Sequence, residues 1–168
     1  MQNRNERVVS GLIVALCCAV AVGCGGSEDA TGIPAQSYQQ LELESSGGGL
    51  PPCSNGKDSY EVTRVPAHLT WVGCDYAKSP PESVMGDRAL SAAELDSVTQ
   101  ALQKVSVSSA KNCGADAGVV TLDLTTNSNV LRYADDFYSG CPWDAQAGRT
   151  FVTGLNELAA VLSQLATP

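Results

Sequence analysis

Cysteines offer the widest chemistry in this chain, because a thiol can be acylated, oxidised to a disulfide or bound to a metal. The first one of interest is Cys24, which ends a stretch reading Ala-Val-Gly-Cys over residues 21–24. Upstream, Arg4 and Arg7 precede a run of 15 mostly apolar residues, Val8–Val22. A membrane-spanning helix needs about 20 apolar residues. The run is therefore typical of a secretory signal segment and not of a permanent membrane span.

The tetrapeptide at residues 21–24 resembles the lipobox of bacterial lipoproteins, with Ala21 where that family most often has Leu. The resemblance implies that residues 1–23 are a signal peptide and that the Cys24 thiol carries a diacylglyceryl group. The implied location is the cell envelope, and the implied partner of Cys24 is the lipid bilayer. Gly25 favours the outer membrane if the source is Gram-negative. An ordinary cleaved signal, with Cys24 incidental, stays open as the alternative.

Four further cysteines lie in residues 53–168, and an exported chain meets oxidising conditions, so we expect two disulfides. We favour pairing Cys53 with Cys74 and Cys113 with Cys141, because each pair brackets a segment that has the pattern of two strands and a turn. The other two pairings stay open. A zinc site is disfavoured, because separations of about 20 to 40 residues include no close pair of ligands.

Carboxylates are the other group that could hold a metal. Asp135 and Asp136 end a predicted strand and Asp144 lies in the loop that follows, so their oxygens are candidate calcium ligands. Alternation along the strand places Asp135 and Asp136 on opposite faces. An inward-facing carboxylate should be hydrogen-bonded, for example near Arg132 or Arg149, and a purely structural role is the alternative.

Catalytic patterns are missing from the sequence. His68 is the single histidine and lies beside a turn at Pro66, and no serine stands in a Gly-x-Ser-x-Gly motif. No phosphate-binding or dinucleotide-binding glycine motif is present. We therefore expect a protein that is not an enzyme and needs no cofactor.

Charge and composition divide the chain into segments. The formal charge is −8, and removal of residues 1–23 leaves 8 basic and 17 acidic residues, or −9, which argues against nucleic acid as a partner. Residues 24–52 contain a Gly-Gly-Gly run and few apolar residues, so they are predicted to form the lipidated end and a disordered tether. Residues 53–168 have the length of a single domain.

Hydrophobic periodicity within residues 53–168 predicts two strand pairs and two helices. Alternation predicts a hairpin over 60–64 and 69–74, and a second over 119–125 and 130–138. Proline and glycine predict a loop over 78–88.

The first helix is expected over residues 92–104. Ser91 and Glu94 form a capping box before its apolar stripe. The second helix is expected just after Thr153, a candidate N-cap residue.

Helices with one apolar face must bury that face against another element. The predicted fold is therefore α+β, with two layers in the order ββαββα. An antiparallel sheet of about four strands carries both helices on one face, and two disulfides staple the domain.

The predicted function is a lipid-anchored, non-enzymatic binding or envelope-associated domain with a protein partner in the envelope. Trp143 and Tyr138 are candidate partner-binding residues, because exposed aromatic side chains anchor many interfaces. The alternative for Trp143 is a structural role, in which its side chain covers the predicted disulfide between Cys113 and Cys141. The order of helix, cysteines and strand pair also resembles the Streptomyces subtilisin inhibitor family, which implies protease inhibition through a loop at residues 114–118. The two glycines in that loop argue against the rigidity that inhibition needs.

Overall fold

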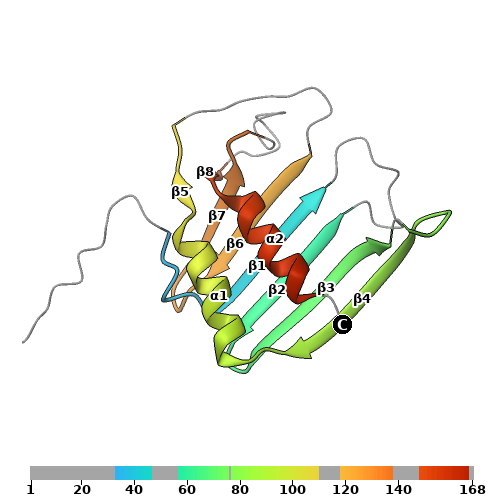
Figure 1. Ribbon diagram of the computed structural model, residues 1–168. Coiled ribbons are helices and arrows are strands. Elements are labelled where there is room, and N and C mark those ends of the chain that lie inside the picture. Colours follow the sequence, from blue (N-terminus) through green and yellow to red (C-terminus); the bar gives the residue numbers. More distant parts are fainter. Residues whose placement is uncertain (1–32, 47–56, 76, 110–117, 138–147, 167–168) are drawn as a thin grey trace, which may run out of the picture.

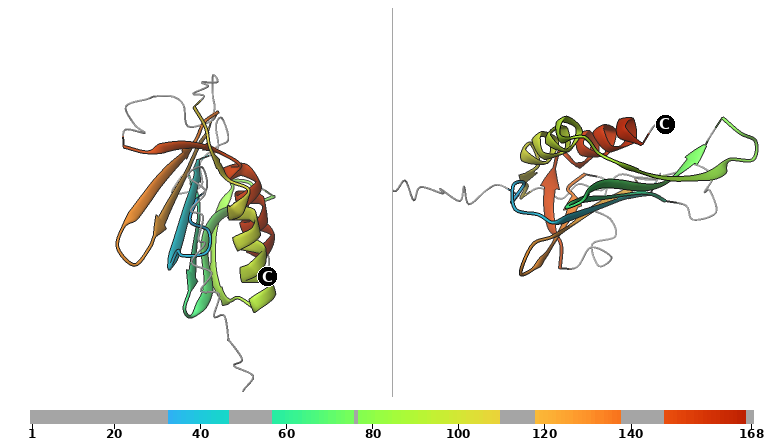
Figure 2. Two further views of the ribbon diagram at one scale, coloured as in Figure 1. Left: turned by 90° about the vertical axis from the view of Figure 1, so that its left-hand side faces the viewer. Right: turned by 90° about the horizontal axis from the view of Figure 1, so that it is seen from below.

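The structure, a computed structural model, describes residues 33–46, 57–75, 77–109, 118–137 and 148–166. One sheet of eight strands carries two helices side by side on one face (Figures 1 and 2). The strand order is β4-β3-β2-β1-β6-β7-β8-β5, and neighbours run antiparallel except β7 and β8, which are parallel. The strands are β1 (Gln40–Ser46), β2 (Asp58–Arg64), β3 (Ala67–Asp75), β4 (Glu82–Ala89), β5 (Ser106–Val107), β6 (Val119–Thr125), β7 (Val130–Asp135) and β8 (Thr150–Thr153). The helices are α1 (Ala92–Gln103) and α2 (Leu155–Leu165).

The α+β class is confirmed, and Figure 2 shows both helices on the same face of the sheet, as expected. The predicted hairpins correspond to the pairs β2/β3 and β6/β7. The expected antiparallel sheet of about four strands in the order ββαββα is wrong, because the described residues form eight strands in a mixed sheet. Strands β5 and β8 have two and four residues, too few to show a periodic pattern.

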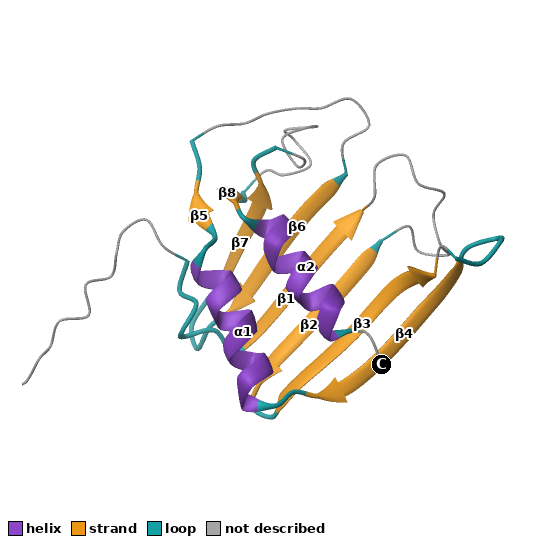
Figure 3. Ribbon diagram, in the orientation of Figure 1, coloured by secondary structure: helices purple, strands orange, loops and turns teal. Residues whose placement is uncertain are grey.

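Strand β1 occupies the centre of the sheet, where it pairs with β2 on one side and β6 on the other (Figure 3). The prediction of a disordered tether over residues 24–52 is therefore wrong for residues 33–46. Leu41 and Leu43 are fully buried on the helix-covered face, and Glu42 between them is exposed on the other. Two buried apolar side chains are enough to hold β1 in the sheet, because strands on both sides form hydrogen bonds with its backbone.

Strand β4 replaces the loop that was predicted over residues 78–88. It pairs with β3 from His68↔Ala89 to Asp75↔Glu82. Most of its side chains are exposed, since it lies at the edge of the sheet and the helices do not cover it. Its sequence consequently lacks the apolar alternation of a half-buried strand.

Helix α1 begins as predicted. The Ser91 side chain accepts a hydrogen bond from the Glu94 amide at 3.3 Å, and the Glu94 carboxylate accepts from the Ser91 amide at 2.8 Å. Arg88 adds a hydrogen bond to Glu94 at 2.8 Å and a second to the Leu165 carbonyl at 2.9 Å. Arg88 therefore ties β4 to the start of α1 and the end of α2.

Helix α2 starts differently from the prediction. Its N-cap residue is Gly154, not Thr153, and it has a left-handed backbone with φ of 93°. A side chain at this position would meet the Lys104 carbonyl at 3.3 Å, so both the conformation and the space favour glycine. Leu155, Leu158 and Leu162 then bury the predicted stripe.

Replacement of Leu43 by alanine should lower the free energy of unfolding by about 2–5 kcal/mol, because a fully buried side chain on the central strand is lost. Denaturant-induced unfolding would measure the loss. The matched control is Glu42→Gln, which changes an exposed side chain on the opposite face of β1 and should stay within about 0.5 kcal/mol. Equal stability of Leu43→Ala and the parent protein would contradict the central position of β1.

The capping box predicts a pH dependence of stability. Hydrogen bonds from Arg88 and then from Ser91 lower the pKa of Glu94 from 4.5 to about 2. A lowered pKa stabilises the fold above pH 4.5, and that contribution is lost as the pH falls from 4.5 towards 2. Thermal unfolding across this range should show a smaller acid loss for Glu94→Gln than for the parent. Glu157→Gln, in the first turn of α2, is the control. This variant should lose as much stability in acid as the parent protein does.

Candidate functional site

Most of the cysteines considered above lie outside the described residues. Cys24, Cys53, Cys113 and Cys141 are among them. Cys74 lies near the end of β3 and is disulfide-bonded. It is the one described cysteine, so no disulfide between two described cysteines is seen and the pairing stays a prediction.

The candidate calcium ligands that the structure describes have structural partners. Asp135 and Asp136 are both buried. Asp135 accepts a hydrogen bond from the Phe137 amide at 3.0 Å, and Asp136 accepts from the Ser108 hydroxyl at 2.5 Å. Asp144 lies outside the described residues. Within the described ranges, no group of three acidic, histidine or cysteine side chains could hold a metal.

Arg132 and Arg149 were suggested as hydrogen-bond partners of the two aspartates. Both arginines pair instead with Asp123 of β6. Arg149 Nη1 donates to Asp123 Oδ1, and Arg132 Nε lies 3.7 Å from Asp123 Oδ2. These pairs belong to the sheet face opposite the helices.

Acidic side chains form a row across that same face. Burial, and then the charges of Glu44, Asp123 and Glu61, raise the pKa of Glu42. The row is thus a region of like-charge repulsion that Arg149 partly relieves.

His68 is half-buried and lies in β3, next to the turn at Pro66. Its Nε2 lies 3.2 Å from Asp87 Oδ2, across the strand pair β3/β4. This ion pair has little energetic weight at the surface. The predicted partner-binding residues, Trp143 and Tyr138, lie outside the described residues.

A groove of about 920 Å³ runs between the C-terminal end of α2 and the strands β3 and β4. It exists because the two helices cover the middle of the sheet and leave β4 bare, as Figure 2 shows from below. Aromatic and apolar side chains make its floor and rim, and all its charged side chains are acidic. Its lining residues are Asp58, Tyr60, Trp71, Gly73, Cys74, Asp75, Val84, Met85, Gly86, Asp87, Ser163 and Ala166.

Trp71 forms the floor of the groove and depends on a glycine of the neighbouring strand. Trp71 pairs with Gly86, and a Cβ atom at Gly86 would lie 2.2–2.8 Å from three atoms of the indole ring. The ring therefore occupies the space in which β4 has no side chain. At Gly73 an added Cβ would meet only Asp58 Oδ1 at 3.5 Å and Val84 at 4.0 Å, both ordinary contacts.

The polar groups of the groove are partly shielded from water. Burial raises the pKa of Asp58, and a backbone hydrogen bond from Cys74 opposes that rise. Burial also raises the pKa of the Tyr60 hydroxyl, which a hydrogen bond with Ser163 of α2 offsets in part. The rim is open, since Met85 is 77% exposed and Val84 41%. The arrangement fits a ligand with an apolar part and a positive charge, and it holds no nucleophile and base in contact among the described residues.

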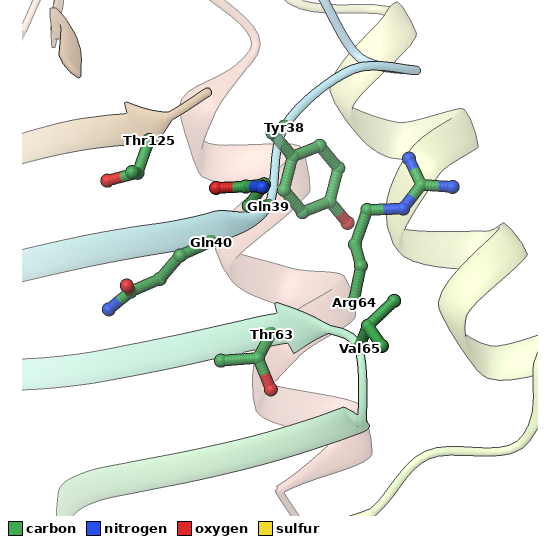
Figure 4. Close-up of a pocket in the computed structure, with 7 residues that line it drawn as sticks. All are labelled: Tyr38, Gln39, Gln40, Thr63, Arg64, Val65 and Thr125. Atoms are coloured by element: carbon green, nitrogen blue, oxygen red, sulfur yellow. The ribbon is translucent and has the colours of Figure 1, made fainter. Parts of the chain in front are cut away.

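A second, smaller pocket of about 440 Å³ lies at the opposite end of β2 (Figure 4). The Arg64 guanidinium lies 5.0 Å from the centre of the Tyr38 ring and donates to the Gln36 carbonyl at 3.0 Å. These contacts fasten the segment before β1 to the end of β2. We interpret this pocket as part of the packing between these two segments, because four of its polar side chains, Gln39, Gln40, Thr63 and Arg64, form hydrogen bonds within the chain.

No pattern in the sequence indicated the groove. Trp71 appeared only as a strand residue, and Gly86 only as a breaker of regular structure. The signal that could have located them is an isolated glycine opposite a tryptophan, which marks close approach of a neighbouring strand.

Replacement of Gly86 by valine should displace the Trp71 ring and destabilise the domain by about 1–3 kcal/mol through overpacking. Fluorescence measured in a Trp143→Phe background, in which Trp71 is the remaining tryptophan, should shift to the red. Gly73→Ala is the matched control on the adjacent strand and should leave the emission unchanged. An unshifted spectrum for Gly86→Val would mean that the ring does not lie over Gly86.

Comparison of the chain with protein-family models, with curated proteins and with solved structures gives no match. Neither described helix is long and apolar enough to cross a membrane. The interpretation of the groove therefore depends on its own residues.

Proposed function

We propose that this chain is a lipid-anchored binding protein of the bacterial cell envelope, and that its domain presents the groove beside Trp71 to a partner. The observation that carries the binding role is the groove itself. An aromatic floor, an exposed apolar rim and acidic flanks stand together beside a bare edge strand. Aromatic side chains in such positions commonly anchor partners.

The location is supported by the sequence. The charged start, the short apolar run and the lipobox-like end of residues 1–24 imply export and acylation of Cys24. If the source is Gram-negative, Gly25 favours the outer membrane. Since β1 belongs to the folded domain, the linker proposed between lipid and domain is shorter than residues 24–52 and ends before Ile33.

The disulfide framework is part of the proposal. The disulfide bond of Cys74 is consistent with export to an oxidising compartment. Ser59 pairs with Val72, so the chain entering β2 comes close to Cys74, and this register favours Cys53 as its partner. Cys113 with Cys141 would form the second bridge.

A non-enzymatic role is supported by the surroundings of His68, which meets an exposed carboxylate instead of a buried catalytic pair. The alternative, a protease inhibitor similar to the Streptomyces subtilisin inhibitor family, would use the loop at residues 114–118. Only Gly118 of that loop is described, and no feature of the described fold favours inhibition over binding.

The intact mass of the protein from its native membrane, before and after reduction, tests both the anchor and the bridges. We expect the mass of residues 24–168 with acyl chains, and a gain of the four hydrogens of two reduced disulfides. Cys24→Ser should abolish acylation and release the protein from the membrane fraction.

Cys18→Ser is the matched control, since Cys18 lies in the segment that is predicted to be removed. It should leave the mature mass unchanged. An acyl-free mass for the parent protein would refute the anchor, and four free thiols would refute the bridges.

A further inference from the structure

Strand β4 exposes a backbone edge that no described strand occupies. It is the terminal strand of the sheet, and the Leu90 amide donates to the Ala67 carbonyl at 3.0 Å. Hydrogen-bonded and non-hydrogen-bonded pairs alternate along an antiparallel ladder. Leu90 is therefore in a hydrogen-bonded pair, and every second residue of β4 from Leu90 bonds to β3. The residues between them, which include Ser83, Met85 and Asp87, point their backbone N–H and C=O groups away from β3.

This edge lacks most of the devices that prevent pairing with another strand, and its charged side chains, Glu82, Asp87 and Arg88, are the exception. The register between β3 and β4 runs without a bulge, and β4 contains neither proline nor lysine. The described residues place no helix over it, and Met85 at its middle is 77% exposed. An edge of eight residues that no described strand or helix covers is long enough to template an added strand.

The charges around the edge define the chemistry of the occupant. Asp58, Asp75 and Asp87 border the groove, and none of its lining residues is basic. The one basic residue of β4, Arg88, is engaged by Glu94 and by the Leu165 carbonyl. The partner should therefore carry positive charge.

We propose that β4 binds an extended peptide that alternates apolar and basic side chains, added to the sheet as a further strand. This inference rests on the proposed binding role of the groove and specifies its partner. An apolar side chain of the peptide opposite Gly86 reaches the edge of the Trp71 ring, because β4 has no side chain there. Basic side chains, which alternate with the apolar ones, face the other side of the sheet, where Asp87 is 72% exposed and its carboxylate is within their reach.

A second copy of the chain is a poorer occupant of the same edge. Its own β4 would bring Glu82 and Asp87 and a single arginine that is already paired. It would also bring a chain of net charge −8 against an acidic groove. A separate basic peptide meets no such repulsion.

The test titrates the detergent-solubilised full-length protein, carrying Trp143→Phe, with a peptide of alternating valine and lysine. Trp71 emission and calorimetry should both show saturable binding, and a valine–glutamate peptide should not bind. Met85→Pro removes an outward amide without breaking the bonds to β3, as proline does on edge strands. It should weaken binding about tenfold, whereas Met85→Ala should weaken it less than about threefold.

A valine–lysine peptide N-methylated at alternate amides tests the same bond on the unmodified strand, in case Met85→Pro does not fold. It too should bind about tenfold more weakly. Absence of binding by the unmodified peptide, or equal binding by the methylated one, would overturn the inference. A dimer of the parent chain that dissociates in Met85→Pro, seen by sedimentation, would assign the edge to a second copy and also overturn it.

Failure of the peptide can be separated from failure of the proposed function. Dodecyltrimethylammonium, a cationic amphiphile, probes the groove without using the strand edge. If it changes Trp71 emission equally in Met85→Pro and in the parent while the peptide does not bind, the inference is overturned and the groove keeps its binding role. If neither probe binds, both the inference and the binding role are refuted.

Discussion

The fold depends on the double pairing of β1. This strand joins β2, β3 and β4 on one side to β6, β7, β8 and β5 on the other, and both of its ladders are antiparallel. Leu41 and Leu43 are buried at the centre of the core, beneath the helices. Without β1, the two halves of the sheet would each expose a long edge and half of the core.

The helices then decide which part of the sheet stays open. Helices α1 and α2 pack against one another and over the central strands, and Arg88 fixes their near ends to β4. The layer of helices is narrower than the eight-stranded sheet (Figure 1). One margin of the helix-covered face is therefore left open, with Trp71 half-buried beside a strand whose outer edge is paired with no described strand. The groove is a consequence of this mismatch in width.

Charge separates the structural carboxylates from those available to a partner. Asp135, Asp136 and Glu94 accept hydrogen bonds that hold turns and a helix end. Asp123 is neutralised by Arg149. The carboxylates of Asp58 and Asp75 border an apolar groove instead, where partial removal from water strengthens their attraction for a cation. An acidic protein can thus present a small, specific cation-attracting surface.

Sequence by itself determined the features that depend on neighbouring residues. The capping box at Ser91 and Glu94, the apolar stripe of α2 and the alternation in β2, β3, β6 and β7 are local patterns, and all four hairpin strands and both helices follow from them. Only the tertiary structure decided the rest. Strand β1 has few apolar residues because neighbours on both sides satisfy its backbone, and β4 lacks alternation because neither of its faces is covered. Trp71 and Gly86 are fifteen residues apart and meet only through the β3/β4 register, so the groove they form is a property of strand pairing, which no local pattern encodes.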